Sequence, residues 1–470
     1  MKVSNPEGLP YMYNNLRILT IKILIIERIK MQLSDKKWED VKKEATQLLR
    51  EYIRINTTNP PGNEIEGANF LKHVLEKESF ECNIFESIKD RGNIVTRLKG
   101  TGEAPSLLLL SHIDVVPVDE DRWEYHPFSG ELVDNNIWGR GALDCKSLGI
   151  AELMVMLLLK RERINLKGDV VLAATADEEA GGVFGAEWMV KEKFPLIKTD
   201  CVINEGGGDG ILTDKGYVFL CQTAEKGIYW MRLKFKGRPG HGSMPHEDNC
   251  IVKMAKAINI ISSYSSPTKV NDVVEKFVEG FGIDKKVFDP NLSKQILKAI
   301  KDKKMTYWIN AMMRNTFSPN VVKGGKKTNV IPSECYLEVD SRVLPGYEPE
   351  YALEELRKLL KDIVEFDVEI IQESIPSQSP IQSPLYKLLE ETIKKWNLKA
   401  KLIPFMQVGG TDSRFFREKG IPAYGFGPLL IDGPYGEFLE MVHGHNEKIS
   451  TDNLLFMIKM LWNVVTEFST

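Results

Sequence analysis

Short apolar runs alternate with longer helical patterns through the first half of this 470-residue chain. The apolar runs lie at 107–116, 169–176 and 201–204, and helical patterns lie between them at 148–159 and 185–193. A short run that is apolar at nearly every position is typical of a strand buried on both faces of a sheet. Because strand and helix alternate, the sequence predicts an α/β domain with a mostly parallel sheet.

The pattern changes near residue 222. Residues 229–236 and 335–343 alternate apolar with polar side chains, as half-exposed antiparallel strands do, and 272–315 is lysine-rich and helical in pattern. The α/β pattern then resumes with expected helices at 350–364, 384–396 and 451–468. We therefore expect an N-terminal extension at 1–33, a first part of the α/β domain at 34–221, an inserted α+β domain at 222–340 and the second part of the α/β domain at 341–470.

The N-terminal residues differ from the rest of the chain. Residues 16–29 are apolar but are interrupted by Lys22, Glu27 and Arg28, and the run is shorter than the roughly 20 apolar residues that span a bilayer. No small-residue cleavage site of a signal peptide follows it. We interpret residues 1–30 as a dispensable or wrongly assigned extension, with a surface amphipathic segment or an extra helix as the alternative, and we expect no membrane partner.

Composition narrows the function classes. The length favours two domains. A formal net charge of -4 argues against a nucleic-acid partner, because nucleic-acid-binding surfaces are basic. The six cysteines are scattered without a CxxC pair, which indicates reduced thiols in a cytoplasmic protein.

Acidic and imidazole side chains follow the apolar runs. His112 and Asp114 come at the end of the first run, Glu178 and Glu179 just after the second, and Glu205 after the third. Open α/β sheets place their sites at the carboxyl ends of the strands. Imidazoles mixed with carboxylates, without clustered cysteines, suit two divalent cations of borderline hardness, whereas a calcium-type site would need mostly oxygen ligands.

The geometry expected at the strand ends suggests roles. Side chains at positions i and i+2 of a strand point the same way, so Asp114 could accept the free ring N–H of His112 and fix its tautomer. Glu178 and Glu179, as neighbours leaving a strand, would face opposite ways, so that one could bind metal while the other addresses a water molecule. The alternatives are a polar strand end and a solvated acidic loop.

Two further segments could supply ligands. Asp144 lies in the glycine-bearing segment GRGALDCK, and its two carboxylate oxygens could bridge two cations about 3.5–4 Å apart. By itself it also fits a turn residue. His443 and His445 lie in VHGHNEK near the C-terminus, and spacing alone does not choose between them.

These motifs resemble a known family. In order along the chain they are SHIDVVP, GRGALDCK, TADEEAGG, NEGG, GRPGHGS, TNVIPSE with DSRVLPG, GGTDSRFF and HGHNEK. The same order is seen in the dinuclear-zinc aminoacylase/carboxypeptidase metallohydrolases, which include aminoacylase-1, glutamate carboxypeptidase, acetylornithine deacetylase and succinyl-diaminopimelate desuccinylase. The resemblance covers residues 35–470, and it is specific because eight motifs match in order. It implies a catalytic α/β domain carrying an inserted dimerisation lid.

The resemblance implies roles for the candidate ligands. His112 and Glu205 would hold one zinc ion, Glu179 and His443 would hold the other, and Asp144 would bridge them. His443 is preferred over His445 because the family ligand lies four residues before the glutamate that is here Glu447. Glu178 would be the general base.

It also implies roles for residues of the lid and a nearby loop. His241 would reach into the site of the partner subunit of a homodimer. Asn329 and Arg342 would grip the substrate carboxylate, and Gly409 and Gly410 would line the same pocket.

The resemblance implies amide hydrolysis in small carboxylate-bearing substrates: dipeptides, short peptides or N-acyl amino acids. Two metal ions would be needed, with zinc expected and cobalt or manganese as alternatives. The rivals are a biosynthetic deacylase of the acetylornithine or succinyl-diaminopimelate type and an inactive metal-binding homologue. The sequence departs from the smaller family members in the long stretch between His241 and Asn329, and from many members in having Cys145 after the bridging position.

Overall fold

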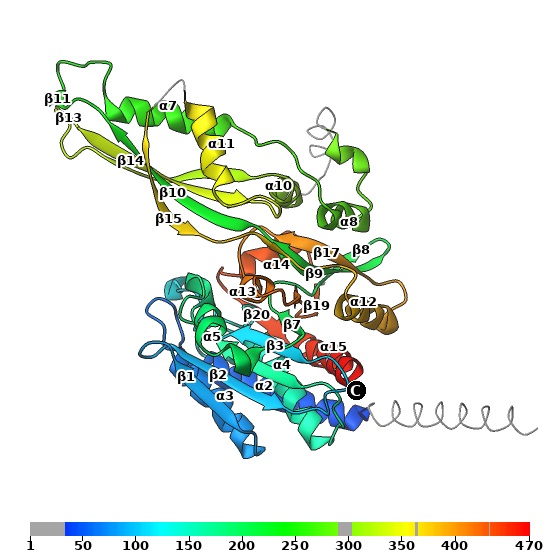
Figure 1. Ribbon diagram of the computed structural model, residues 1–470. Helices are drawn as coiled ribbons and strands as arrows, with labels where there is room; N and C mark the ends of the chain where they lie inside the picture. Colours follow the sequence, from blue (N-terminus) through cyan, green and yellow to red (C-terminus); the bar gives the residue numbers. More distant parts are fainter. Residues whose placement is uncertain (1–32, 290–302, 362–364, 432) are drawn as a thin grey trace, which may run out of the picture.

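The computed structural model describes residues 33–470 except 290–302, 362–364 and 432. The expected extension at 1–33 therefore lies almost wholly outside the described residues. The described chain forms two lobes (Figure 1). The large lobe is built from residues near both ends of the described chain, and the smaller lobe lies above it. Within this described part, no helix has the length and apolar character to cross a bilayer.

The large lobe is a mixed α/β fold around one sheet. Its strands run in the order β1-β2-β6-β3-β7-β18-β9-β8-β19, with β16 and β17 also pairing with β9. The neighbours β6, β3, β7 and β18 are parallel, which agrees with the predicted sheet. The bounds are β1 Cys82–Glu86, β2 Gly92–Leu98, β3 Leu107–His112, β6 Val170–Thr175, β7 Cys201–Asn204, β8 Asp209–Thr213, β9 Gly216–Glu225, β16 Ser377–Gln378, β17 Lys401–Gln407, β18 Ala423–Gly425 and β19 Leu429–Ile431.

Helices cover both faces of this sheet. Successive residues of β3 point to opposite faces, so Leu109 joins the core under one helical layer and Leu110 joins the core under the other. The first layer contains α2 (Asp35–Ile53), α3 (Glu64–Lys77), α4 (Lys146–Arg161), α12 (Pro384–Trp396) and α15 (Thr451–Ser469). The second contains α5 (Ala186–Glu192), α6 (Phe194–Ile197) and α13 (Ser413–Arg417). Burial on both faces explains why the strands are continuous apolar runs in the sequence.

The small lobe is an antiparallel sheet in the order β12-β14-β10-β15. Its strands are β10 (Gly227–Lys236), β12 (Thr316–Gly324), β14 (Glu334–Val343) and β15 (Asp367–Glu373), and α7 (Cys250–Ser263) and α11 (Tyr351–Leu360) complete its core. Because β15 pairs with β10 along six residue positions, the boundary expected at residue 340 is corrected to beyond Glu373. An alternating strand pattern does not indicate which sheet the strand joins.

Part of the inserted stretch packs on the large lobe. Helices α8 (Asp272–Gly280) and α10 (Lys303–Met312) place Phe277 and Ile309 in the main core, and α8 lies against β17. The short 3-10 helix η3 spans Lys285–Phe288. At the far end of the small lobe, β11 (Gly240–His241) pairs with β13 (Val330–Ile331). Thus the long stretch seen in the sequence divides between the two lobes.

Three short strands and a helix complete the large lobe near the site. They are β4 (Glu131–Val133), β5 (Asn136–Trp138) and β20 (Lys448–Ser450), which pair in the order β20-β5-β4, and α14 (Tyr435–Met441). The 3-10 helices η1 (Glu120–Arg122) and η2 (Glu178–Ala180) lie in loops. The pairing of β20 with β5 brings the C-terminal HGHNEK segment beside GRGALDCK.

Candidate metal centre

Three of the candidate ligand segments start from neighbouring parallel strands. His112 is the last residue of β3, η2 follows β6, and Glu205 follows β7. Because β6, β3 and β7 are adjacent and parallel, their carboxyl ends meet at one edge of the sheet. The strand ends therefore bring these side chains together, as the sequence predicts.

Asp144 lies between two imidazoles. Its Oδ1 atom is 2.9 Å from Nε2 of His112, and its Oδ2 atom is 3.0 Å from Nε2 of His443. Each carboxylate oxygen thus faces a different histidine. This is the arrangement that a carboxylate bridging two cations requires.

The remaining acidic side chains divide between the two histidines. Oε2 of Glu179 is 3.1 Å from Nε2 of His443, while Glu178 and Glu205 have atoms within 4.8 Å of a ring nitrogen of His112 and of each other. Buried Oε1 of Glu179 has no hydrogen-bond partner in the described part of the chain. An orphaned carboxylate oxygen among clustered N and O donors fits a divalent cation.

The electrostatics also call for a cation. Burial, together with the negative charge of Asp144, raises the pKa of Glu205 to about 8. Burial and the charge of Glu205 raise the pKa of Glu178 well above its usual range. Carboxylates packed this closely repel one another in the absence of positive charge, so bound divalent cations would return them to their ionised form.

Asp114 contacts His112 differently from the expectation. Nδ1 of His112 lies 2.9 Å from the backbone oxygen of Asp114 and 3.6 Å from its carboxylate. The main chain therefore fixes the imidazole orientation. The Asp114 carboxylate instead accepts hydrogen bonds from the backbone N–H groups of Glu178 and Glu179, both at 3.1 Å. It positions the loop that carries the two glutamates.

Glu178 and Glu179 diverge for a reason other than strand alternation. They form the first turn of η2, after Asp177 has taken a left-handed backbone conformation with φ 70°. Asp177 is buried and is held by Arg91 at 2.5 Å and Asn59 at 3.1 Å. The expectation that extended backbone separates the two side chains is thus corrected: a tethered turn does so.

Sequence reasoning missed several residues that hold the site. The Glu447 carboxylate accepts the backbone N–H groups of Leu143 at 2.6 Å and Asp144 at 3.0 Å, and it pairs with Arg140 at 2.7 Å. Asp412 is buried, and its carboxylate accepts a hydrogen bond from the Thr175 hydroxyl at 2.9 Å. The motifs HGHNEK and GGTDSRFF contain these two acids, but their role comes from contacts with distant segments.

Cys145 is buried beside the His112 backbone. Its Sγ atom lies 3.4 Å from the backbone nitrogen of His112, and burial raises the thiol pKa to about 12. His112, Asp144 and Cys145 also form a group whose atoms lie within 4.8 Å of one another, whereas the other two candidate groups consist of imidazoles and carboxylates alone.

The proposed lid residues lie apart from this cluster. His241 is exposed on β11, with Nδ1 2.7 Å from the Ser243 hydroxyl, and the backbone oxygen of Asn329 accepts the N–H of Gly242 at 2.8 Å. His241 and Asn329 thus lie together at the far end of the small lobe. Within one chain the structure does not bring His241 to the metal centre.

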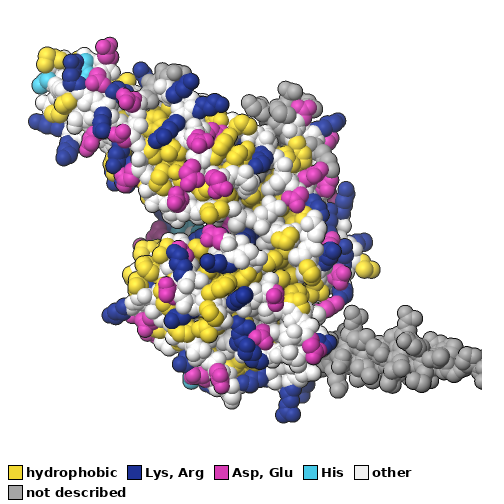
Figure 2. Space-filling view, in the orientation of Figure 1, with side chains coloured by type: hydrophobic (Ala, Val, Ile, Leu, Met, Phe, Trp, Pro, Cys, Tyr) yellow, Lys and Arg dark blue, Asp and Glu magenta, His cyan; other side chains and the backbone are white. Residues whose placement is uncertain are grey.

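Arg342 and the glycine loop lie nearer to the large lobe. Arg342 forms an ion pair with Asp340 at 2.7 Å. It lies directly opposite Ile228 of the neighbouring strand β10. Gly410 follows β17 and is also close to Ile228, with Gly409 beside it. The carboxylate-binding residues proposed from the sequence therefore form two groups, Asn329 with His241 and Arg342 with the glycines. Figure 2 shows the molecule narrowed and hollowed between its two lobes.

A family model for peptidase family M20/M25/M40 matches residues 108–467. The chain belongs to this family. N-fatty-acyl-amino acid synthase/hydrolase PM20D1 of Xenopus tropicalis is 27% identical over 485 residues, covering 96% of this chain and 93% of the relative. Aminoacylase-1 of Sus scrofa is 27% identical over 410 residues, covering 86% and 89%.

Solved structures share the fold. A family M20 metallo-carboxypeptidase from Sulfolobus solfataricus has a TM-score of 0.70 at 22% identity, covering 90% of this chain and 99% of that one. Human carnosine dipeptidase 1 has a TM-score of 0.65 at 14% identity, covering 94% and 98%. The YXEP protein of Bacillus subtilis, described as a dinuclear metal-binding peptidase, has a TM-score of 0.60 at 15% identity, covering 91% and 98%. The predicted family and fold are confirmed, and the chain is a metal-dependent amidohydrolase.

Proposed function

We propose that the protein hydrolyses the amide bond of small carboxylate-bearing substrates, with N-acyl amino acids ahead of dipeptides and short peptides. The observation that carries the proposal is the position of Asp144, whose two oxygens face His112 and His443 while Glu178 lies beside His112. N-acyl amino acids come first because two of the similar proteins are an aminoacylase and an N-fatty-acyl-amino acid synthase/hydrolase.

In this proposal the chain holds two divalent metal ions, zinc being preferred and cobalt or manganese being alternatives. His112 and Glu205 would bind one ion, Glu179 and His443 would bind the other, and Asp144 would contact both. Ions bound there would activate a water molecule and polarise the carbonyl oxygen of the amide. Imidazole and carboxylate donors suit all three metals, so the donor set alone does not select among them.

Glu178 is the proposed general base. Its carboxylate lies within 4.8 Å of His112 and Glu205, and in the ionised form that bound cations favour it can accept a proton from water at the site. Glu178 takes the proton of the attacking water, and the same carboxyl group then delivers it to the nitrogen of the leaving amine. Asp114 acts through the loop by fixing the backbone of Glu178.

The lid residues complete the proposed mechanism. We assign His241, supplied by the second subunit of a homodimer, to the oxyanion that develops on the carbonyl oxygen. Arg342 and the loop of Gly409 and Gly410 would bind the substrate carboxylate through the planar donors of the guanidinium, and Asn329 would join them from the second subunit together with His241. A homodimer is proposed because His241 is exposed at the far end of the small lobe, where a second copy could receive it.

A cytoplasmic location also stays a proposal. It is supported by the cysteines, all six of which are free in the described chain. Cytosolic thiols are kept reduced, whereas secreted domains usually pair them.

A substrate panel tests the proposed function. Protein stripped of metal and reloaded with Zn²⁺, Co²⁺ or Mn²⁺ is assayed against N-acetyl amino acids, dipeptides, N-acetylornithine and N-succinyl-diaminopimelate. We expect hydrolysis of N-acyl amino acids that requires metal and is lost again with chelator. Metal-loaded protein that binds two ions but cleaves no member of the panel would overturn the proposal and favour the inactive homologue.

A further inference from the structure

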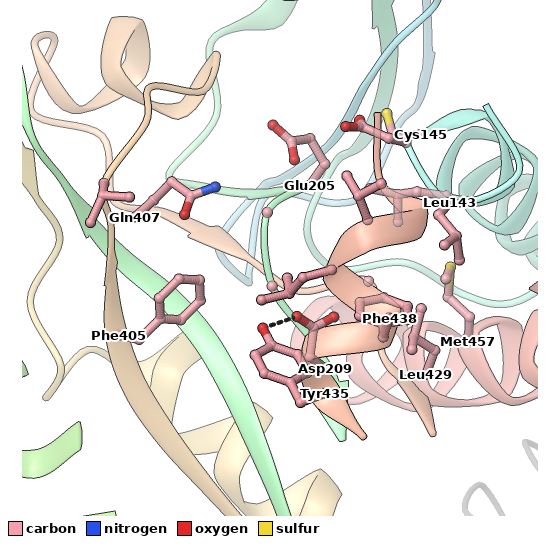
Figure 3. Close-up of a pocket in the computed structure, with 18 of the residues that line it drawn as sticks. Leu143, Cys145, Glu205, Asp209, Phe405, Gln407, Leu429, Tyr435, Phe438 and Met457 are labelled. Atoms are coloured by element: carbon pink, nitrogen blue, oxygen red, sulfur yellow. Dashed lines mark hydrogen bonds between the residues drawn. The ribbon is translucent and has the colours of Figure 1, made fainter. Parts of the chain in front are cut away.

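A cavity of about 360 Å³ opens beside the metal centre, on the side of Asp144 and Glu205 (Figure 3). From Asp144 and Glu205 its lining extends to Phe405 on β17 and Phe438 on α14. Its position next to the proposed ligands means that a substrate amide placed at the metals would direct one of its two substituents into this space.

The walls of the cavity are mostly apolar. They come from α4, β17, β19, α14 and α15, through Leu148, Phe405, Leu429, Phe438 and Met457. No lysine, arginine or histidine is among its described lining residues. A mostly apolar cavity with few polar groups is the usual form of a site for an apolar ligand group.

Two polar groups at the far wall are hydrogen-bonded to each other. The Tyr435 hydroxyl donates to Oδ2 of Asp209 at 2.8 Å, as the dashed line in Figure 3 shows. The ring of Tyr435 stacks on Phe438 with centroids 6.0 Å apart, so its apolar face is part of the wall. At this wall a substrate carboxylate would meet Asp209, with no lysine, arginine or histidine among the described lining residues to pair with it, and it is therefore excluded from this part of the cavity.

The inserted stretch supplies one wall. Trp308 on α10 lines the cavity, with its ring centroid 5.4 Å from that of Phe405 and 5.9 Å from that of Tyr435. Phe277 on α8 supports the indole from behind at 5.4 Å. The segment that departs from the smaller family members in length thus reaches the neighbourhood of the metal centre.

We propose that this cavity receives the acyl group of the substrate, that it selects large apolar acyl groups, and that Trp308 is a specificity-determining residue. The inference rests on the proposed function. An N-acyl amino acid has its carboxylate on the amine side of the scissile bond, and charge excludes that side from the cavity. The acyl side remains, and the proposed carboxylate-binding residues Arg342 and Gly410 lie outside the described lining.

The proposal predicts a rise in activity with acyl length. Each methylene transferred from water into an apolar cavity should raise kcat/KM about fourfold until the cavity is full. The N-acetyl, N-hexanoyl, N-decanoyl and N-phenylacetyl derivatives of one amino acid measure this effect. The N-succinyl derivative should be the poorest of the series, because its second carboxylate would approach Asp209 at a wall where the described residues include no lysine, arginine or histidine.

A reciprocal series separates the two sides of the amide bond. N-acetyl derivatives of glycine, leucine and phenylalanine vary the amine side alone. We expect kcat/KM to change far less along this series than along the acyl series. A strong preference set by the amino-acid side chain together with a flat acyl profile would place that side chain in the cavity and overturn the proposal.

Two variants alter the cavity in opposite ways. Trp308→Ala removes a wall, and Gly427→Val fills space, because a Cβ atom at Gly427 would lie 3.4 Å from Leu148 and 3.8 Å from Met457. Both should lower the decanoyl-to-acetyl ratio of kcat/KM by about tenfold or more, as pocket changes of this size do. Trp308→Phe should restore part of the ratio.

Tyr307→Ala is the matched control, since Tyr307 is the neighbour of Trp308 on α10 but is 71% exposed. It should keep the wild-type ratio. An unchanged ratio in both Trp308→Ala and Gly427→Val, with folded protein and hydrolysis of N-acetyl substrates, would overturn the acyl assignment and leave the proposed function intact. Absence of hydrolysis for every acyl derivative by metal-loaded wild-type protein would instead refute the proposed function, and the inference with it.

Discussion

The Glu447 carboxylate accepts the backbone N–H of Asp144 at 3.0 Å, although 303 residues separate the two in the chain. The same carboxylate is buried, pairs with Arg140 and follows His443 by four residues. It therefore fixes the proposed bridging ligand and one proposed histidine ligand relative to each other. An acid that binds no metal itself can position two side chains that do.

Replacing this acid should weaken metal binding. Glu447→Gln keeps the size of the side chain but removes its negative charge. That charge pairs with Arg140 and strengthens the hydrogen bonds from the backbone N–H groups of Leu143 and Asp144. We expect metal affinity to fall about 10- to 100-fold, as for other residues that orient metal ligands. Competition with a chelator measures the affinity. Glu437→Gln, which changes an exposed acid on α14, is the control and should keep wild-type affinity.

Glu178→Ala should separate metal binding from turnover. Glu178 is the proposed proton carrier, so its removal should lower kcat by at least about 10²–10⁴-fold, the contribution of general acid–base catalysis. Metal content should stay near two ions per chain, because five other side chains are the proposed ligands. Metal analysis together with kcat tests this assignment. Loss of one ion in the variant would make Glu178 a ligand, and a wild-type kcat would refute its role as base.

Mixed dimers can test whether His241 acts on the partner subunit. His241→Ala and Glu178→Ala homodimers should both be nearly inactive. A mixed dimer contains one site with Glu178 from one chain and His241 from the other, so dissociation and reassociation of the two variants should restore activity to about a quarter of wild type under random pairing. Activity that does not recover, in mixtures proven to exchange subunits, would place His241 in the site of its own chain or outside catalysis.

Asp209 should make stability depend on pH. Burial raises its folded-state pKa to about 6 from the usual 3.8. The folded state therefore binds more protons than the unfolded state between these values, and the stability present at about pH 4 is lost as pH rises through about 6. By 1.36 kcal/mol per pKa unit, the loss is on the order of 3 kcal/mol.

Asp209→Asn removes this titration and retains an acceptor for the Tyr435 hydroxyl. Relative to wild type, the variant should gain free energy of unfolding between pH 4.5 and pH 7.5, measured by urea denaturation of metal-free protein. Asp214→Asn changes an exposed acid in the adjoining hairpin and should show no such gain. A difference between Asp209→Asn and wild type that is the same at both pH values would contradict the assignment.

The sequence predicts the large sheet well because burial on both faces leaves a direct pattern. Residues 107–112, 170–175 and 201–204 form strands within the apolar runs, and α4 occupies the apolar stretch between the first two. The place of β15 could not be predicted in this way. Its alternating residues indicate a strand with one exposed face, and pairing with β10 depends on long-range contacts.

The candidate ligands were predictable for a similar reason. His112 and Glu205 lie at or just after strand ends, and the family motifs single out Asp144, Glu179 and His443. What the sequence lacked was the supporting contacts. Asp114, Asp177 and Glu447 act through backbone N–H groups and buried ion pairs with segments far away in the chain. Trp308 likewise carries no local pattern that relates it to the cavity.

The division of the inserted stretch between the two lobes constrains how they can move. A simple insertion is joined to its host domain by two chain connections. In this protein the chain passes between the lobes at four described places, after Glu225, Ser263, Met312 and Glu373. The buried Lys226 ammonium ties two of these passages together through the backbone oxygens of Ala311 and Arg314. A swing of the small lobe must therefore bend all four connections at once, which restricts its motion more than the two connections of a simple insertion would.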